Sequence, residues 1–273
     1  MSEIKLAIIG FPLKRTLSPL IYKIIFEKFN LKVEYKILRF DKRKLTSFLK
    51  KLFNFTNSLD GLNITAPYKT LICDFPFIKS REARKIKSAN TLKIEGNKFY
   101  SFNTDIYGFE RFLRVNGIIA KNKDIMIFGT GGVARAILYA LKNKGFKRIF
   151  LISRNKNKAK KLIKDLKIKN KKIIPSDYKE IEKCDIYINC SSGANKKFIN
   201  FQFNSKALFI DLNYSASLTP FLRYAKKFKA KNIFDGKEIL FYQALKNFEI
   251  WTKKRIDEKT ENILKKEFLG RIK

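Results

Sequence analysis

Short apolar runs alternate along the chain with segments in which apolar residues recur every three or four positions. The runs Lys5–Ile9, Val33–Leu38 and Gly61–Ile64 predict strands, and the periodic segments Pro19–Phe29 and Lys42–Phe53 predict helices. This alternation is typical of an α/β protein built on a mainly parallel sheet.

The pattern changes after residue 66. The segment Pro67–Lys87 is expected to be helical with an interruption at Pro76. Two alternating runs, Thr91–Ile94 and Lys98–Phe102, flank the dipeptide Gly96-Asn97 and predict a β-hairpin.

A second series of elements begins after a helix expected over Ile106–Asn116. Its predicted strands are Asp124–Phe128, Arg148–Ile152, Lys172–Ile174, Asp185–Asn189, Ala207–Asp211 and Asn232–Phe234. Its predicted helices are Ala134–Lys142, Lys158–Leu166 and Pro220–Lys229, followed by Glu238–Lys254 and Asp257–Phe268. We therefore expect an α/β substrate domain over residues 1–105 and a Rossmann-type, doubly wound dinucleotide-binding domain over 106–236. The helices of residues 237–273 are expected to pack back on the first domain.

Composition places the chain among folded proteins, since 45% of its residues are hydrophobic and 14% aromatic. No apolar run reaches the roughly 18 residues that span a bilayer, and the apolar stretch at the N-terminus is too short for a signal peptide. The three cysteines lack metal-ligand spacing and the chain has no histidine. We expect a cytoplasmic protein with reduced thiols, no metal and no membrane partner.

The net charge of +36 arises from 60 basic and 24 acidic side chains. A basic field attracts phosphates and carboxylates, and it can bind nucleic acid nonspecifically. The lysines, however, are scattered along every segment, and no nucleic-acid-binding motif accompanies them. A nucleic-acid-binding protein is therefore the less favoured alternative, and we expect no specific nucleic-acid partner.

A glycine-rich turn follows the predicted strand Asp124–Phe128 directly. It fits the pattern G-x-G-x-x-G/A and consists of Gly129, Thr130, Gly131, Gly132, Val133 and Ala134. Gly129 permits the tight turn, Gly131 lets the backbone approach a diphosphate, and Ala134 lets the helix pack on the strand. The N-terminus of the following helix offers free N–H groups to the diphosphate, so dinucleotide binding is predicted.

The end of the next strand indicates which dinucleotide binds. NAD-selective sites carry an acidic residue there, and this chain has none after Ile152. Ser153, Arg154 and Lys158 can instead bond and neutralise a 2′-phosphate, with Asn155 as a further candidate contact. NADP is therefore favoured over NAD.

Polar clusters follow apolar runs in the first domain. They are Thr16–Pro19, Asn63–Thr65, Ser88–Thr91 and Asn103–Asp105. If the strands are parallel, these clusters share one edge of the sheet and suit a small polyhydroxylated ligand. Ser18 has an alternative role as a helix N-cap before Pro19, and asparagines can simply satisfy turn backbone. Because histidine is absent, Lys69 and Asp105 are the leading candidates for proton transfer.

These motifs resemble the shikimate dehydrogenase family. The matching segments are Gly10–Pro19, Gly61–Lys69, Ala89–Leu92, Asn103–Asp105 with Gly108, Asp211–Tyr214, Leu218–Leu222, Asp235–Gly236 and Gln243–Ala244. They occur in order and cover essentially the whole chain. Thr16 departs from the family pattern, in which serine is usual.

The resemblance implies the NADPH-dependent, reversible reduction of 3-dehydroshikimate to shikimate, a step towards chorismate and the aromatic amino acids. It makes Lys69 and Asp105 the catalytic pair and leaves open which of them transfers the proton. The residues it assigns to substrate binding are these two with Thr16, Ser18, Thr65, Asn90, Tyr214 and Gln243. Leu212 and Gly236 would contact the nicotinamide end of NADP, and Gly129–Val133 its phosphates. A quinate/shikimate dehydrogenase that uses NAD is the alternative, and a monomer or homodimer is expected.

Overall fold

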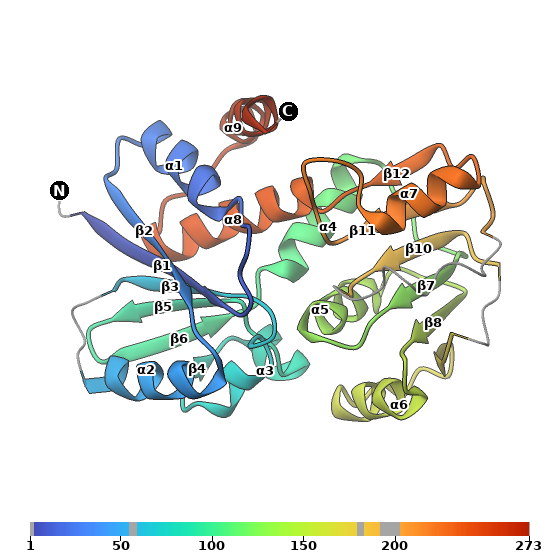
Figure 1. Cartoon of the computed structure of the whole chain (residues 1–273), viewed down its shortest axis with the longest axis horizontal. Helices are drawn as coiled ribbons and strands as arrows, with labels where there is room; N and C mark the ends of the chain where they lie inside the picture. The colour runs from blue at the N-terminus through green and yellow to red at the C-terminus, as the bar shows by residue number, and fades with distance from the viewer. Residues whose placement is uncertain (1–2, 55–58, 179–182, 192–202, 273) are drawn as a thin grey trace. The chain divides into compact units, whose positions relative to one another are not determined.

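The computed structural model describes residues 3–54, 59–178, 183–191 and 203–272. The chain forms two compact units, one of Met1–Gly108 with Phe241–Lys273 and one of Phe109–Leu240 (Figure 1). Helices α4 (Asp105–Val115) and α8 (Lys237–Thr252) each run from one unit into the other. None of the helices in these ranges is long and apolar enough to cross a bilayer.

The first unit is built on a six-stranded mixed sheet of order β2-β1-β3-β5-β6-β4. Its strands are β1 (Ile4–Gly10), β2 (Val33–Arg39), β3 (Gly61–Ile64), β4 (Ile78–Lys79), β5 (Thr91–Glu95) and β6 (Lys98–Phe102). Strands β2, β1 and β3 are parallel, β5 is antiparallel to β3, and β6 is antiparallel to β5. The start of β5 therefore lies at the same edge as the carboxyl ends of β1, β3 and β6.

Both faces of this sheet are covered by helices (Figure 1). On one face, Leu45 and Leu49 of α2 (Lys42–Asn54) join a buried cluster with Ala7, Ile9 and other sheet residues. On the other lie α1 (Ser18–Lys28), α8 and α9 (Glu258–Arg271). Because β1 is covered on both faces, its residues from Leu6 to Gly10 are all buried, as expected of a central parallel strand.

The expectation of a broken helix over Pro67–Lys87 is only partly correct. The segment contains a 3₁₀ turn (Leu71–Asp74), the short strand β4 and helix α3 (Arg81–Ile86). Pro76 carries no backbone N–H and separates the turn from the strand. The two residues of β4 then pair with Tyr100 and Ser101 at the edge of the sheet, a tertiary contact that local periodicity does not reveal.

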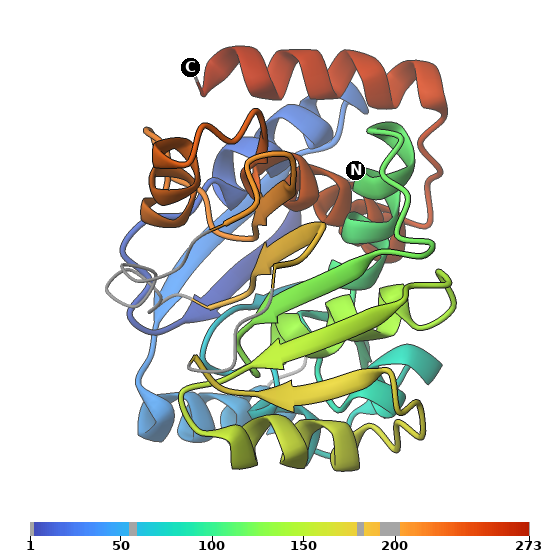
Figure 2. The same ribbon diagram turned by 90° about the vertical axis from the view of Figure 1, so that its right-hand side faces the viewer.

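The second unit contains a fully parallel six-stranded sheet of order β12-β11-β10-β7-β8-β9 (Figure 2). Its strands are β7 (Asp124–Phe128), β8 (Arg148–Ile152), β9 (Ile173–Ser176), β10 (Ile186–Asn189), β11 (Leu208–Asp211) and β12 (Asn232–Phe234). Counted within the unit, this is the order 3-2-1-4-5-6 of dinucleotide-binding folds, which reverses between its first and fourth strands, β7 and β10. The predicted fold class is confirmed.

The helices of this unit are α5 (Gly132–Leu141), α6 (Lys156–Asp165) and α7 (Pro220–Lys227). Helices α5 and α6 each begin two residues before their predicted starts. For α6 the reason is a cap: the side chain of Asn155 accepts a hydrogen bond from the backbone N–H of Asn157 at 2.9 Å.

An ion pair at the start of β7 makes the second unit sensitive to acid. Arg148 donates from Nε and Nη2 to the two carboxylate oxygens of Asp124 at 3.0 and 2.9 Å, which holds the pKa of that carboxyl below its usual range. Asp124→Asn is expected to lower the free energy of unfolding at pH 7 by about 1–2 kcal/mol. The stabilisation is fully present above the unfolded-state pKa of about 3.9, and it is lost as pH falls below that value and through the lower folded-state pKa. Urea unfolding at a series of pH values measures this; a difference from the parent chain that does not shrink over this acid range would contradict it.

Candidate active site

A lysine–aspartate ion pair lies at the carboxyl edge of the first sheet. Lys69 Nζ donates to Asp105 Oδ2 at 2.7 Å, and the two side chains are only 13% and 11% exposed. Asp105 is the first residue of α4, separated from the end of β6 by Asn103-Thr104, and Lys69 lies in the turn after β3. Among the described residues, no other side chain is recorded as a hydrogen-bond partner of Lys69 Nζ. Its remaining two N–H groups are therefore available to a ligand.

Backbone hydrogen bonds hold the lysine turn in place. The N–H of Thr65 donates to Ile9 O at 2.9 Å, which continues the pairing of β3 with β1. The N–H of Tyr68 then donates to Thr65 O at 3.0 Å, and Ala89 N–H donates to Lys69 O at 2.8 Å. The last of these bonds ties the turn that carries Lys69 to the segment that precedes β5.

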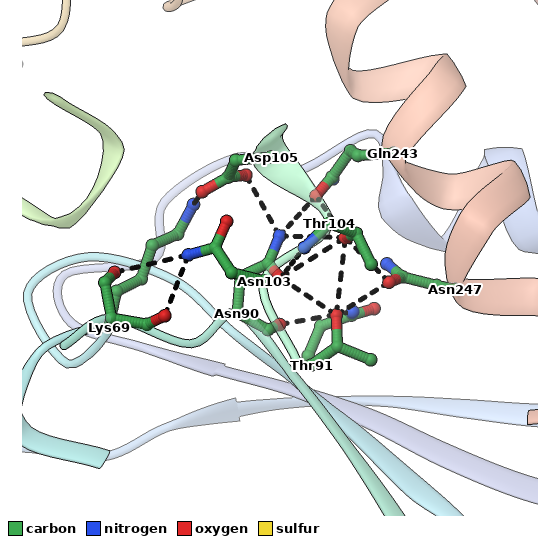
Figure 3. A network of polar contacts seen from close by, with 10 residues as sticks. Lys69, Asn90, Thr91, Asn103, Thr104, Asp105, Gln243 and Asn247 are labelled. Carbon is green, nitrogen blue, oxygen red and sulfur yellow. Dashed lines mark hydrogen bonds and ion pairs between the residues drawn. The ribbon is translucent and has the colours of Figure 1, made fainter. Parts of the chain in front are cut away.

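Asn90 links the ion pair to helix α8 (Figure 3). Its Nδ2 donates to Asp105 Oδ1 at 2.9 Å and to Gln243 Oε1 at 2.7 Å, while its Oδ1 accepts the backbone N–H of Thr104 at 2.8 Å. Asn90 is 2% exposed, so these partners and not water satisfy its amide. The four predicted residues Lys69, Asp105, Asn90 and Gln243 are thus brought together, although Gln243 is 153 positions from Asn90 in the chain.

Three further residues belong to this network: Thr91 and Thr104, which lie in the predicted polar clusters but were assigned no individual role, and Asn247, which was not predicted. Thr91 and Thr104 are buried beside Asn90, and their hydroxyls contact Asn247 Oδ1 at 2.6 and 2.8 Å. Asn247 follows Gln243 by one helical turn and is fully buried. An amide at an otherwise apolar position of the predicted helix Glu238–Lys254 is the signal in the sequence that could have identified it.

The other substrate residues predicted in this unit are separate from the network. Thr16 Oγ1 donates to Ser18 Oγ at 3.0 Å, and Ser18 N–H donates to Thr16 Oγ1 at 3.2 Å. The alternative role of Ser18 as an N-cap is wrong, because Leu17 occupies that position and no side chain caps the helix. Thr65 is half-buried, and no hydrogen bond of its hydroxyl is recorded among the described residues.

The side chain of Asn63 makes contacts within the protein. Its Oδ1 accepts the hydroxyl of Tyr35 at 2.7 Å, and its Nδ2 lies 3.5 Å from Asn90 O. Tyr214, the remaining predicted substrate residue, belongs to the second unit and lies in the loop after β11.

The glycine-rich turn of the second unit connects β7 to α5. Gly129 has φ +108°, and a Cβ there would lie 3.1 Å from Ser191 Cβ, so both conformation and space favour glycine. Gly131 is different: it is exposed, its backbone is extended, and a Cβ would meet nothing within 4 Å. Folding does not require glycine at position 131, and the open space over this helix N-terminus fits a diphosphate held by backbone N–H groups.

Four predicted contacts of the adenosine end follow β8. Ser153 is buried, while Arg154 and Lys158 are exposed. Burial raises the pKa of the Tyr178 phenol, and the nearby charge of Arg154 offsets part of that rise. Asn155 serves as the N-cap of α6, so its side-chain oxygen is already engaged.

The two predicted contacts of the nicotinamide end lie next to each other, Leu212 in the loop after β11 and Gly236 in the loop after β12. A Cβ on Gly236 would lie 2.4 Å from Leu212 O, so only glycine fits there. The loop after β11 is organised by buried Asp211, which accepts from Asn189 Nδ2 at 3.0 Å and from Thr219 Oγ1 at 2.6 Å. Burial raises the pKa of the Asp211 carboxyl, and these donors offset part of the rise.

Comparison with known proteins adds independent evidence. A model of the shikimate dehydrogenase substrate binding domain matches residues 8–92, and a model of the saccharopine dehydrogenase NADP binding domain matches residues 125–235. A shikimate dehydrogenase (NADP(+)) of Clostridium beijerinckii is 34% identical over 264 residues, which are 92% of this chain and 93% of that protein. One from Caldicellulosiruptor saccharolyticus is 35% identical over 258 residues, 90% and 91% of the two chains.

A solved structure extends the match to the fold. The chorismate mutase/shikimate 5-dehydrogenase fusion protein of Clostridium acetobutylicum has a TM-score of 0.83 at 30% identity, with 100% of this chain and 99% of that chain covered. Fold and relatives together define an oxidoreductase with an NADP-binding unit. More narrowly, the chain belongs to the shikimate dehydrogenase (NADP(+)) family.

Proposed function

We propose that this chain catalyses the NADPH-dependent, reversible reduction of 3-dehydroshikimate to shikimate, with Lys69 and Asp105 as its catalytic pair. The observation that carries the proposal is the 2.7 Å contact between Lys69 and Asp105 within a buried polar network, in a chain of this family. In the cytoplasm, as we expect, this reaction supplies the route to chorismate and the aromatic amino acids.

Lys69 stabilises and protonates the reacting oxygen. NADPH, when bound, supplies the hydride, and negative charge then develops on the C3 oxygen of the substrate. An ammonium group whose remaining N–H donors have no partner among the described residues can bond that oxygen more strongly as its charge grows, and can pass it a proton. A side chain 13% exposed does so in a partly dehydrated setting, where the interaction is stronger than in water.

Asp105 holds the lysine and binds the substrate. One of its oxygens faces Lys69 and the other accepts from Asn90, so the carboxylate orientation is set on both sides. In the proposal, Gln243 bonds substrate hydroxyls and Thr65 completes that contact with its hydroxyl. Asn90, whose amide hydrogens go to Asp105 and Gln243, serves the substrate site by orienting these two residues. Thr16 and Ser18 bind the substrate carboxylate, and Tyr214 is a further substrate contact.

The second unit holds NADP. The Gly129–Val133 turn binds the diphosphate through backbone N–H groups other than that of Gly129, which donates to Ile152 O at 2.9 Å. Leu212 and Gly236 contact the nicotinamide end. Ser153, Arg154 and Lys158 bind the 2′-phosphate, with Asn155 supporting their loop as the cap of α6. Because Arg154 and Lys158 are exposed cations, NADP is favoured over NAD.

Steady-state oxidation of shikimate and of quinate, each with NADP and with NAD, tests the proposal directly. We expect shikimate with NADP to have the highest kcat/KM and the preference for NADP to exceed about tenfold, as the charge pairing with a 2′-phosphate implies. Faster oxidation of quinate, or equal use of NAD, would instead identify a quinate/shikimate dehydrogenase.

Gly131→Ala provides a selective test of the cofactor turn. We expect the NADPH dissociation constant to rise about tenfold or more, because a methyl group would occupy the space left for the diphosphate. The thermal midpoint should be unchanged, since a Cβ at Gly131 meets nothing within 4 Å. Gly270→Ala in α9 is the matched control, because its Cβ also meets nothing within 4 Å. Unchanged NADPH affinity in Gly131→Ala, measured by calorimetry, would contradict the assigned role.

A further inference from the structure

A chain of buried polar side chains continues from the active-site amide of Asn90 into the interior of the first unit (Figure 3). It runs through the hydroxyls of Thr91 and Thr104 to Asn247, whose Nδ2 donates to the hydroxyl of Tyr22 at 2.8 Å. Tyr22, Thr91 and Asn247 are each no more than 1% exposed. Such a network is costly to bury unless every member is satisfied, so its presence so close to the ion pair needs a reason.

The number of available protons determines how this network is arranged. Asn90 Nδ2 has two hydrogens but three acceptors within reach: Gln243 Oε1 at 2.7 Å, Asp105 Oδ1 at 2.9 Å and Thr104 Oγ1 at 3.1 Å. The two shorter contacts take the hydrogens. Gln243 and Asp105 are therefore both oriented by the same amide group.

Asn247 is the nearest acceptor for the hydroxyl hydrogens of Thr91 and Thr104. Each hydroxyl has one hydrogen, and the shortest acceptor for both Thr91 and Thr104 is Asn247 Oδ1, at 2.6 and 2.8 Å. Each hydroxyl also lies within hydrogen-bond distance of Asn90 Oδ1, at 3.0 and 3.2 Å, and can donate there instead, so the two threonines join the amide of Asn247 to that of Asn90. Asn90 Oδ1 accepts the backbone N–H of Thr104 as well, which fixes the direction of the Asn90 amide.

Tyr22, at the other end of the network, is held in place by an aromatic contact. Tyr22 stacks on Tyr35 with ring centroids 4.8 Å apart, and Tyr35 in turn donates to Asn63. Burial raises the pKa of the Tyr22 phenol well above its usual range, with hydrogen bonds from Asn247 and Asn63 opposing the rise. Tyr22 therefore stays neutral and remains an acceptor for Asn247 throughout the physiological range.

We propose that Asn247 is a positioning residue of the active site, which acts through Thr91 and Thr104 on Asn90 and so orients Asp105 and Gln243. The inference rests on the proposed function. It adds a residue that touches neither substrate nor cofactor, yet is required for the geometry of the residues that bind the substrate. The helical spacing of four residues between Gln243 and Asn247 lets one helix face supply both the substrate contact and its support.

The pair Thr91→Val and Thr91→Ser tests this most sharply. Valine keeps the shape of threonine and removes the hydroxyl, whereas serine keeps the hydroxyl and removes a methyl group. We expect Thr91→Val to lose about 10- to 100-fold in kcat/KM for shikimate, the size of effect that misplacing a reacting group by about 1 Å produces. Thr91→Ser should stay within about threefold of the parent chain. A purely structural role predicts instead that both variants lose stability while kcat/KM for shikimate stays within about threefold in each, because serine leaves a cavity and valine leaves Asn247 Oδ1 short of a donor.

Asn247→Leu, with similar volume and no amide, should reproduce the loss of Thr91→Val while the KM for NADP changes by less than about twofold. The double variant of Thr91→Val with Asn247→Leu should be no less active than the poorer single variant, because both substitutions break the same connection.

Phe248→Leu is the matched control: Phe248 is equally buried in α8, but it packs on Phe26 and Phe29. It should lower stability and leave the kinetic constants for shikimate intact.

These experiments distinguish a failure of the proposed function from a failure of this inference alone. Absence of shikimate oxidation by the unsubstituted chain would overturn the proposed function and this inference with it. An active parent chain with near-parent kinetics in both Thr91→Val and Asn247→Leu would overturn the inference alone. If Asn247→Leu fails to fold, as circular dichroism would show, the Thr91 pair still decides.

Discussion

Lys69→Ala is expected to lower kcat for shikimate oxidation by about 10³-fold or more while NADPH binding persists. General acid–base catalysis and charge stabilisation at a reacting oxygen each contribute about 10²- to 10³-fold, and both are assigned to this ammonium group. Lys69 belongs to the first unit, whereas the glycine-rich turn belongs to the second. Steady-state kinetics and calorimetric titration with NADPH therefore report on the two functions separately.

The chain offers a matched control in Lys93. Its side chain is 11% exposed, compared with 13% for Lys69, and it pairs with Glu95 at 2.9 Å. A lysine that is merely a buried ion-pair partner should behave as Lys93 does. We expect Lys93→Met to affect the free energy of unfolding and to leave kcat within about twofold. Near-normal turnover in Lys69→Ala would remove the lysine from the mechanism, whatever the control shows.

Gly61→Ala is expected to destabilise the protein by about 2–5 kcal/mol, through overpacking and a broken buried hydrogen bond. A Cβ on Gly61 would lie 2.2 Å from Nε1 of Trp251 and 2.8 Å from its Cε2. The same Nε1 donates to Leu92 O at 2.9 Å, in the strand next to β3. Displacement of the indole would therefore leave a buried carbonyl without its donor. Urea unfolding gives the free-energy change.

The substitution Trp251→Phe separates the two causes of this destabilisation, the overpacking and the broken hydrogen bond. The smaller ring removes the atom that would clash, and it also removes the hydrogen bond to Leu92. In that background, Gly61→Ala should cost clearly less than in the parent chain, with a coupling energy of about 1–3 kcal/mol. Equal costs in both backgrounds would show that the indole is not what excludes a side chain at position 61.

Much of the fold could be predicted because local patterns and tertiary packing agree in most elements. The strands of the second unit are short, its central strands β7 and β10 are fully buried, and the glycine-rich turn marks the start of α5. The hairpin β5–β6 follows from alternation around Gly96-Asn97, and Gly96 has φ +56° as that turn requires. Strand β4 could not be predicted, because two residues carry no periodicity and their pairing depends on β6.

The site was predictable where a residue type is unusual for its position, and not where its role depends on distant partners. Lys69 follows a strand and a proline turn, and Asp105 follows a hairpin strand, so both stood out in a chain without histidine. Ser18 and Asn155 show the limit: a polar residue before a helix can be a cap or a ligand contact, and only the structure shows that Asn155 caps while Ser18 does not. Asn247 depends on contacts across 143 and 156 positions, beyond any local pattern.

The sequence separations within the network also imply an order of assembly. Asn90 and Asp105 are 15 positions apart and meet when the hairpin closes, whereas Lys69 joins Asp105 across 36 positions. Gln243 and Asn247 arrive across 139 to 156 positions, and closing so large a loop costs more entropy. During synthesis the acid–base pair can therefore form long before the helix that orients it has left the ribosome. We expect a nascent chain that ends before α8 to contain the reacting groups without the geometry that makes them an enzyme.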